Sequence, residues 1–147
     1  MHNNQHFSPD DEAPEVVYPL GVEYGIVADG RIQSYRDLRV WQAAMDLVEA
    51  VYSATKRFPS EERFGLVSQL QRSAVSVPSN IAEGWGRGRT KEYQQFLRYA
   101  RASLKEAETQ WLIAGRLGYL DSDTTADLDS QGQSLGRQLL ALMRALR

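Results

Sequence analysis

Residues 37–58 read DLRVWQAAMDLVEAVYSATKRF, and this stretch decides the fold. Its apolar side chains recur at spacings of three and four residues, which predicts an α-helix over about 37–57 that Pro59 ends. These side chains form two parallel stripes. The first stripe consists of Leu38, Trp41, Met45, Val48, Tyr52 and Thr55. The second stripe consists of Val40, Ala44, Leu47, Val51, Ala54 and Phe58.

Two apolar stripes are more than one helix needs in order to pack into a small bundle. We expect one stripe to face the core of its own chain and the other to be covered by a second subunit, because an exposed apolar stripe favours association. We assign the subunit interface to the second stripe. The predicted interface residues are Val40, Leu47, Val51 and Phe58.

Three further segments carry the same spacing of three and four residues and predict helices over about 61–85, 91–117 and 123–146. The links between them are only a few residues long, so neighbouring helices must be antiparallel. The predicted fold is therefore all-α, an up-down-up-down four-helix bundle.

Capping and helix-breaking residues set the expected ends of these helices. The expected N-caps are Ser60, Thr90 and Ser122. The expected stops are Gly84, Gly86 and Gly88 for the second helix and Gly118 for the third. Pro78 is expected to kink the second helix without breaking it.

Composition excludes several classes of protein. The chain has 147 residues, 42% of them hydrophobic, which suits one folded domain with a real core. Because it has no cysteine, it lacks disulfides, thiolate zinc sites and a cysteine nucleophile, and we expect a cytoplasmic protein. No apolar run approaches the roughly 20 residues of a membrane span. His2 and His6 are the only histidines, so we expect no serine–histidine catalysis, no metal site and no cofactor in the bundle.

Charge divides the chain into two parts. The first 30 residues carry six acids and no Lys or Arg, together with three prolines and three glycines. We therefore interpret 1–33 as an extended acidic N-terminal arm and 34–147 as the four-helix-bundle domain. The arm also holds apolar residues, so docking on the bundle and disorder both remain open. Residues 31–147 carry 17 basic against 13 acidic side chains, which makes the body basic.

The third predicted helix offers a candidate surface for nucleic acid. Its polar side carries basic side chains at spacings of three and four residues, and two more arginines precede it. The six candidates, which we call the basic stripe, are Arg87, Arg89, Lys91, Arg98, Arg101 and Lys105. Such a stripe can follow the phosphates of RNA or DNA by charge, with little reading of sequence. The alternative is an ordinary solvated helix face.

Polar residues beside the apolar stripes of the second and third helices predict a structural network. Its members are Gln69, Arg72, Asn80, Glu83, Ser103 and Glu106. We expect an ion pair between Arg72 and Glu106, within one protomer or across a subunit contact. We prefer this structural interpretation to an acid/base couple of Glu83 with Glu106. The glycine-bearing run 84–88 predicts a turn, and the three tryptophans predict core or subunit contacts before base stacking.

Three motifs carry a resemblance to a known family: SYRDLRVW at 34–41, SVPSNIAEG at 76–84 and SLKEAET at 103–109. The chain over about 34–147 resembles the bacterial four-helix-bundle proteins encoded in intervening sequences of large-subunit ribosomal RNA, once described as ribosomal-protein-like. The resemblance implies an up-down-up-down bundle assembled as a homopentamer, with no established enzymatic reaction. More remotely, the chain is similar to the accessory variability protein of diversity-generating retroelements, a basic pentamer that engages nucleic acid and a reverse transcriptase.

Two functions of different class therefore remain open. One is a non-enzymatic, pentameric nucleic-acid-associated protein that uses the basic stripe. The other is a protein-scaffold ring that binds a protein partner and uses its arginines for internal contacts.

Overall fold

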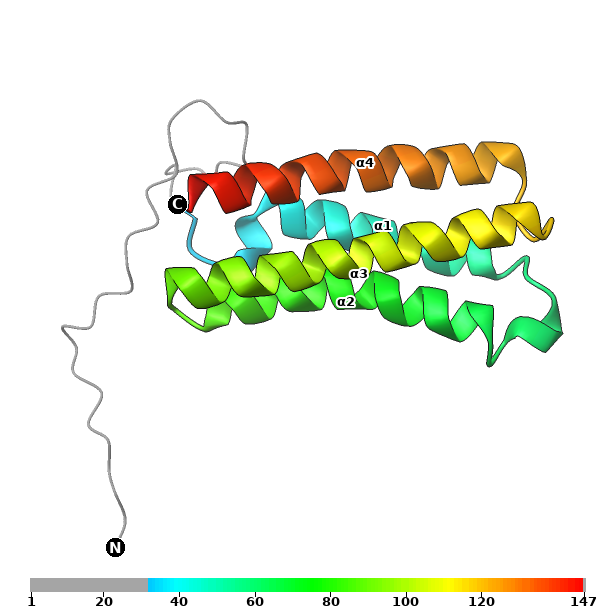
Figure 1. Ribbon diagram of the computed structural model, residues 1–147, viewed down its shortest axis with the longest axis horizontal. Helices are drawn as coiled ribbons and strands as arrows, with labels where there is room; N and C mark the ends of the chain where they lie inside the picture. Colours follow the sequence, from blue (N-terminus) through cyan, green and yellow to red (C-terminus); the bar gives the residue numbers. More distant parts are fainter. Residues whose placement is uncertain (1–31, 147) are drawn as a thin grey trace, which may run out of the picture.

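Four α-helices form most of the structure, a computed structural model that describes residues 32–146 (Figure 1). The helices are α1 (Arg39–Thr55), α2 (Leu66–Gly86), α3 (Thr90–Arg116) and α4 (Ser122–Ala145), with two short 3-10 turns, η1 (Tyr35–Asp37) and η2 (Ser60–Glu62). No strand occurs within the described range. The predicted all-α fold with four helices is confirmed.

Each helix packs on two neighbours and not on the helix diagonally opposite. The packed pairs are α1 with α2, α2 with α3, α3 with α4 and α4 with α1. Successive helices run in opposite directions along one long axis (Figure 1). The start of α1, the turn between α2 and α3 and the end of α4 therefore meet at one end, which we call the proximal end. The links α1–α2 and α3–α4 lie at the distal end.

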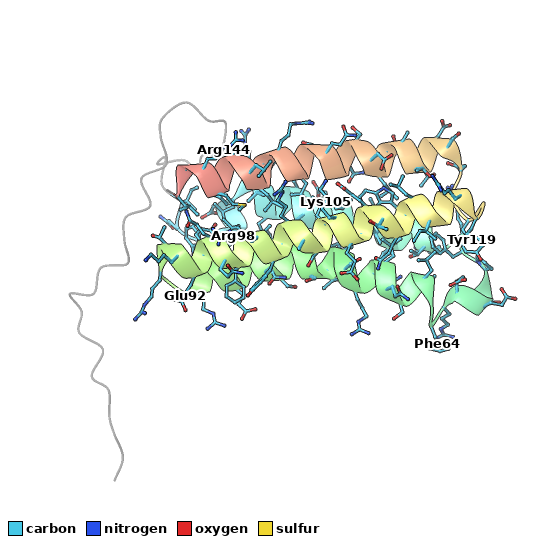
Figure 2. The ribbon with its side chains drawn as sticks, viewed as in Figure 1. Phe64, Glu92, Arg98, Lys105, Tyr119 and Arg144 are labelled. Carbon is cyan, nitrogen blue, oxygen red and sulfur yellow. The ribbon has the colours of Figure 1, made fainter. Side chains whose placement is uncertain are left out.

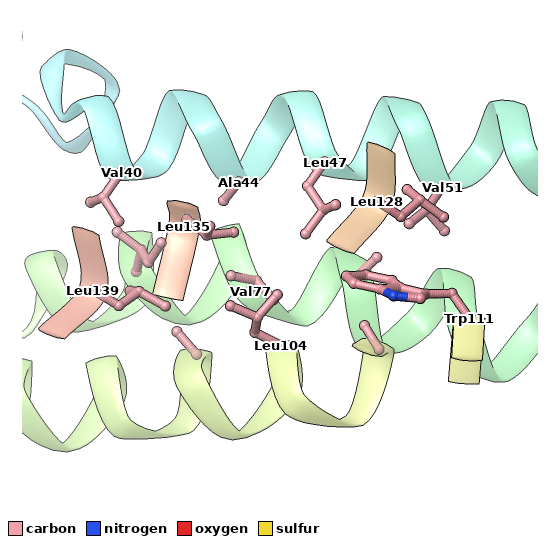
Figure 3. Packing of buried hydrophobic residues seen from close by; sticks show 14 of the residues in the cluster. Val40, Ala44, Leu47, Val51, Val77, Leu104, Trp111, Leu128, Leu135 and Leu139 are labelled. Atoms are coloured by element: carbon pink, nitrogen blue, oxygen red, sulfur yellow. The ribbon is translucent and has the colours of Figure 1, made fainter. Parts of the chain in front are cut away.

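The second stripe of α1 faces the core of its own chain, not a second subunit. Val40, Leu47 and Val51 are 0% exposed and Phe58 is 8% exposed within a single chain. Figure 3 shows the first three pointing from α1 toward Val77, Leu104 and Leu128 of the other helices. The predicted interface assignment is therefore wrong, because residues buried inside one protomer are not available to another. The middle of the first stripe is left at least partly at the surface, with Met45 and Tyr52 exposed, while its end residues Leu38 and Thr55 are buried.

Trp111 of α3 is the largest fully buried side chain. Its indole Nε1 donates a hydrogen bond to Asp129 Oδ1 of α4 at 2.7 Å, so its polar atom has a partner. Opposite the ring, α4 has Gly132, and a Cβ built there would lie 2.9 Å from Trp111 Cη2. The missing side chain of Gly132 therefore makes room for the indole.

Helix ends differ from the predicted ones by a few residues, for local reasons. Ser34 and Asp37 form a capping box around η1, so α1 begins only at Arg39. The expected caps Thr90 and Ser122 are instead the first helical residues. Asp121 caps α4 by accepting a hydrogen bond from the Thr124 backbone N–H at 2.7 Å. That hydrogen bond is the main reason why the pKa of the Asp121 carboxyl is lowered.

The α2 helix departs most from its predicted bounds. It begins at Leu66, whose N–H donates to Glu62 Oε2 at 2.9 Å, while residues 60–62 form η2. It continues through Pro78, as expected, but also through Gly84 and Gly86, which were predicted to end it. Of these three glycines only Gly88, in the turn to α3, has a positive φ, of 70°. Gly118 has the same role after α3, with a φ of 77°.

Within residues 32–146, none of the helices combines the length and the apolar character that crossing a membrane requires. The predictions for the N-terminal arm concern residues 1–31, which lie outside the described residues.

Candidate nucleic-acid interface

The structure places the whole basic stripe on the α2–α3 turn and on α3 as far as Lys105. Arg87 and Arg89 flank Gly88 in the turn, and the other four residues follow along α3. Figure 2 shows Arg98 and Lys105 on α3, with Arg144 on α4 near the same end of the bundle. All six side chains of the stripe are exposed. The sequence spacing therefore corresponds to a continuous basic surface.

Three of the six cations have partners inside the chain. Arg87 pairs with Glu83, with 3.0 Å between Nη2 and Oε1, and its guanidinium lies 5.0 Å from the centre of the Phe96 ring. Lys105 pairs with Glu108 at 2.8 Å between Nζ and Oε2. Arg98 donates to the neutral Gln95 Oε1 at 3.1 Å and keeps its full charge. Exposed pairs of this kind are weak and exchange readily with other anions.

The other three cations, Arg89, Lys91 and Arg101, form no ion pair or side-chain hydrogen bond with any part of the chain that the structure describes. Arg101 has no acidic residue three or four positions away on its own helix. Arg89 and Lys91 lie at the start of α3, where the helix dipole already favours anions. These three side chains are therefore available to phosphate groups.

Charge is distributed unequally between the two ends of the bundle. At the proximal end, residues 32–42, 83–98 and 139–146 contain seven Arg or Lys against three Asp or Glu. At the distal end, residues 53–69 and 109–127 contain four against five. Among the described residues, the proximal end therefore carries the greater positive charge.

The predicted polar network exists in part. Asn80 Nδ2 donates to the Ser76 hydroxyl oxygen at 2.9 Å, and the Ser76 hydroxyl lies 2.8 Å from that of Ser103, which joins α2 to α3. About one turn closer to the distal end, the buried Ser73 hydroxyl donates to Gln110 Oε1 at 2.6 Å. Gln110 Nε2 in turn donates to Glu106 Oε1 at 3.2 Å. These bonds connect the two helices that pack most closely.

The predicted ion pair between Arg72 and Glu106 does not form within one protomer. Arg72 is exposed and pairs with no acidic residue between 32 and 146. Successive helical residues are about 100° apart, and it is Ser73, not Arg72, that faces α3 at this level. Gln69 is also exposed. The carboxylates of Glu83 and Glu106 have separate partners, Arg87 and Gln110, and form no couple.

The first stripe of α1 forms an apolar surface beside α2. Met45 is 38% and Tyr52 is 45% exposed, while Trp41 and Val48 are half-buried. One turn from Tyr52, Thr55 accepts a hydrogen bond from Gln71 Nε2 of α2, which shows that this side of α1 borders α2. Val75, one turn beyond Gln71, is also exposed. We call Trp41, Met45, Val48, Tyr52 and Val75 the α1–α2 apolar face.

The exposed aromatic residue near the basic stripe is Tyr99, not a tryptophan. Trp111 is buried, and Trp41 and Trp85 pack edge-on against Tyr35 and Tyr93. Tyr99 is 48% exposed and was not singled out from the sequence. The available signal was its position between Arg98 and Arg101, one step off the apolar spacing of α3.

Metal chemistry has no visible donor set in the part of the chain that the structure covers. No three His, Cys, Asp or Glu side chains between residues 32 and 146 are grouped so as to hold a metal ion.

Comparisons with known proteins agree with the bundle. A sequence model described as "23S rRNA-intervening sequence protein" matches residues 36–141. A crystal structure of a protein with unknown function from the S23 ribosomal protein family of Bacteroides thetaiotaomicron has a similar fold. The two have a TM-score of 0.66 and 16% sequence identity, over 71% of this chain and 97% of that chain. No match was found among curated proteins.

Proposed function

The chain belongs to the 23S rRNA-intervening sequence protein family, and from that premise we propose that it is a non-enzymatic, ring-forming protein that binds the backbone of RNA or DNA. The observation that supports this proposal best is the proximal end, where seven cations face three acids. Two of those cations, Arg89 and Lys91, lack a partner within residues 32–146, and so does Arg101 further along α3. The lack of cysteine favours the cytoplasm as its compartment.

Backbone contacts explain how such a surface works. Each phosphate that a Lys or Arg neutralises releases counterions, so the affinity falls steeply as the salt concentration rises. An α-helical row of cations carries no base-reading groups of its own, so binding through it is general and not sequence-specific. In a ring of subunits the stripe is repeated, and the affinity for a long polyanion rises through multivalency.

Charge removal at the unpartnered cations tests this proposal. We expect the triple variant Arg89→Gln, Lys91→Gln and Arg101→Gln to bind a labelled single-stranded RNA more weakly. The slope of log K against log salt concentration is expected to fall by about 2 to 3, because three phosphate contacts are lost. Fluorescence anisotropy between 50 and 200 mM salt measures both quantities.

The matched control removes the same charge from the distal end: Lys56→Gln, Arg63→Gln and Arg116→Gln. It is expected to leave the slope unchanged. Equal weakening by both triples would show that net charge, and not the basic stripe, controls binding. Wild-type protein that binds neither RNA nor DNA at 50 mM salt would refute the proposed function.

The α1–α2 apolar face supports the ring. It is the surface that remains after the second stripe has been used for the core, and it runs along one face of α1 between Trp41 and Tyr52. Apolar side chains in such a row on a soluble chain mark an interaction surface. We assign this face, in place of the second stripe, to subunit contacts, and we take a pentamer as the number of copies from the family resemblance.

Solution mass tests the ring. Light scattering is expected to give about 83 kDa for a pentamer, five times the 16.6 kDa of one chain. We expect Met45→Glu to reduce the mass to that of one folded chain, because it places a charge in the apolar face. Leu112→Glu on α3, where the side chain is comparably exposed at 46%, is expected to keep the larger mass. A wild-type particle of a single chain would contradict the ring.

The scaffold function has one observation in its favour. Arg87 and Lys105 already pair with acids of their own chain, and Arg98 is bonded to Gln95. A ring whose cations serve only the fold would bind protein and not nucleic acid. The RNA titration above separates the two functions, since a scaffold ring has the larger mass and no affinity for RNA.

A further inference from the structure

An aromatic pair on α3 lies beside the basic stripe. The rings of Phe96 and Tyr99 have centroids 5.5 Å apart and planes at 82°, an edge-to-face contact. The guanidinium of Arg87 also lies over the Phe96 ring, 5.0 Å from its centre. Arg87, Phe96 and Tyr99 thus form a connected series from the α2–α3 turn to the surface of α3. Its outermost member, Tyr99, is 48% exposed.

The position of Phe96 is fixed by close helix packing. A Cβ built on Gly84 of α2 would lie 2.7 Å from Phe96 Cβ, so the two backbones approach here as closely as a glycine allows. Phe96 is half-buried as a result. Because Phe96 supports one edge of Tyr99, the tyrosine ring has a rigid base and loses little freedom when a ligand binds to it.

Two cations contact side chains next to Tyr99. Arg87 lies on Phe96, and Arg98 bonds to Gln95, whereas Arg101 lies on the opposite side of α3 from Tyr99. Arg98 donates to Gln95 one turn before Tyr99, so its charge lies along the same stretch of α3. An exposed aromatic ring among cations is the combination by which proteins bind single-stranded nucleic acid, the ring stacking on a base and the cations on phosphates.

We propose that Tyr99 is a stacking platform for an unpaired base of single-stranded RNA. This inference rests on the proposed nucleic-acid binding and adds the form of the ligand. The bases of a duplex are already stacked and paired, so their faces are inaccessible to Tyr99. Single-stranded RNA therefore gains the stacking contact in addition to phosphate contacts, and duplex RNA gains phosphate contacts alone. We choose RNA because its loops and bulges present unpaired bases to proteins.

The experiment compares a labelled 12-nucleotide single-stranded RNA with the same strand annealed to its complement, by fluorescence anisotropy of the full chain. Tyr99→Ala is expected to weaken single-strand binding about 5- to 150-fold, as one base–aromatic stack provides. Duplex binding and the salt slope for both ligands are expected to stay at wild-type values, because no phosphate contact is lost. Tyr99→Phe, which keeps the ring, is expected to bind like the wild type.

Phe64→Ala is the matched control, since Phe64 is an 89% exposed aromatic residue with Arg63 beside its ring, but lies at the distal end. It is expected to leave RNA affinity unchanged. Circular dichroism of each variant confirms that the fold is retained. If wild-type protein binds RNA and Tyr99→Ala binds the single strand equally well, the platform is refuted while the proposed function stands. If wild-type protein binds neither ligand, both are refuted.

Discussion

Replacing Trp111 by alanine is expected to lower the free energy of unfolding by about 3–5 kcal/mol, the cost of deleting a large buried aromatic side chain. Trp111 is 0% exposed and contacts the site on α4 that Gly132 leaves open. Glycine at that site offers no side chain that could move into the cavity. The change also leaves the Asp129 carboxylate without its hydrogen-bond donor. Urea denaturation at one fixed protein concentration, followed by circular dichroism, measures the effect.

Two variants separate the contributions. Trp111→Phe keeps an aromatic ring but removes the Nε1 donor, so its destabilisation is expected to be smaller than that of alanine. Trp85→Ala removes a half-buried indole at the proximal end and is expected to cost less than Trp111→Ala. A Trp111→Ala protein within about 1 kcal/mol of the wild type would show that the core is not organised around this residue.

The sequence was sufficient to predict the helices but not which face of α1 is buried. Apolar spacing depends on the period of a helix alone, so it located all four helices to within a few residues. Both stripes of α1 have the same period and consist mainly of apolar side chains. The choice between them depends on how α1 is rotated against α2 and α4, which is a property of the packed bundle. The stripe with Trp41, Met45 and Tyr52 has the bulkier side chains, and these lie at the surface.

In the candidate site too, features of a single helix could be predicted and contacts between helices could not. Spacing correctly gathered the basic residues of α3 on one surface, because it required only one straight helix. The pairs Glu83–Arg87 and Lys105–Glu108 were visible as helical neighbours four and three residues apart but were not anticipated. The Arg72–Glu106 pair does not form within one protomer, because a shift of one residue turns a side chain by about 100° around its helix, and Ser73 faces α3 instead. Tyr99 was missed because it lies beside the apolar stripe of α3. The spacing of apolar residues does not show whether a side chain in that position is exposed.

Glycines gave the least reliable signal. A glycine ends a helix where the chain needs a positive φ, as at Gly88, and permits close helix contact where it has ordinary helical geometry, as at Gly84. The residue type is identical in the two cases. Only the position of α3, known from the structure, distinguishes them.

Two alanine substitutions on α2 are therefore expected to change the free energy of unfolding in opposite directions. Gly84→Ala would place a Cβ 2.7 Å from Phe96 Cβ and 2.9 Å from Tyr93 Cδ2. Neither atom is the free end of a flexible side chain, so α3 must move away from α2. We expect the free energy of unfolding to fall by about 1–3 kcal/mol, as for other overpacked contacts. Urea denaturation measures it.

Gly86→Ala is the control, two residues further along α2. A Cβ there has no atom within 4 Å, and the backbone is already helical. Alanine loses less conformational freedom than glycine on entering a helix, so this change is expected to stabilise the protein by up to about 1 kcal/mol. Both substitutions raise helix propensity equally, and they differ only in whether α3 is in contact. Equal effects of the two substitutions would therefore mean that α2 and α3 do not approach at Gly84, and the support for Phe96 beneath Tyr99 would be lost with that contact.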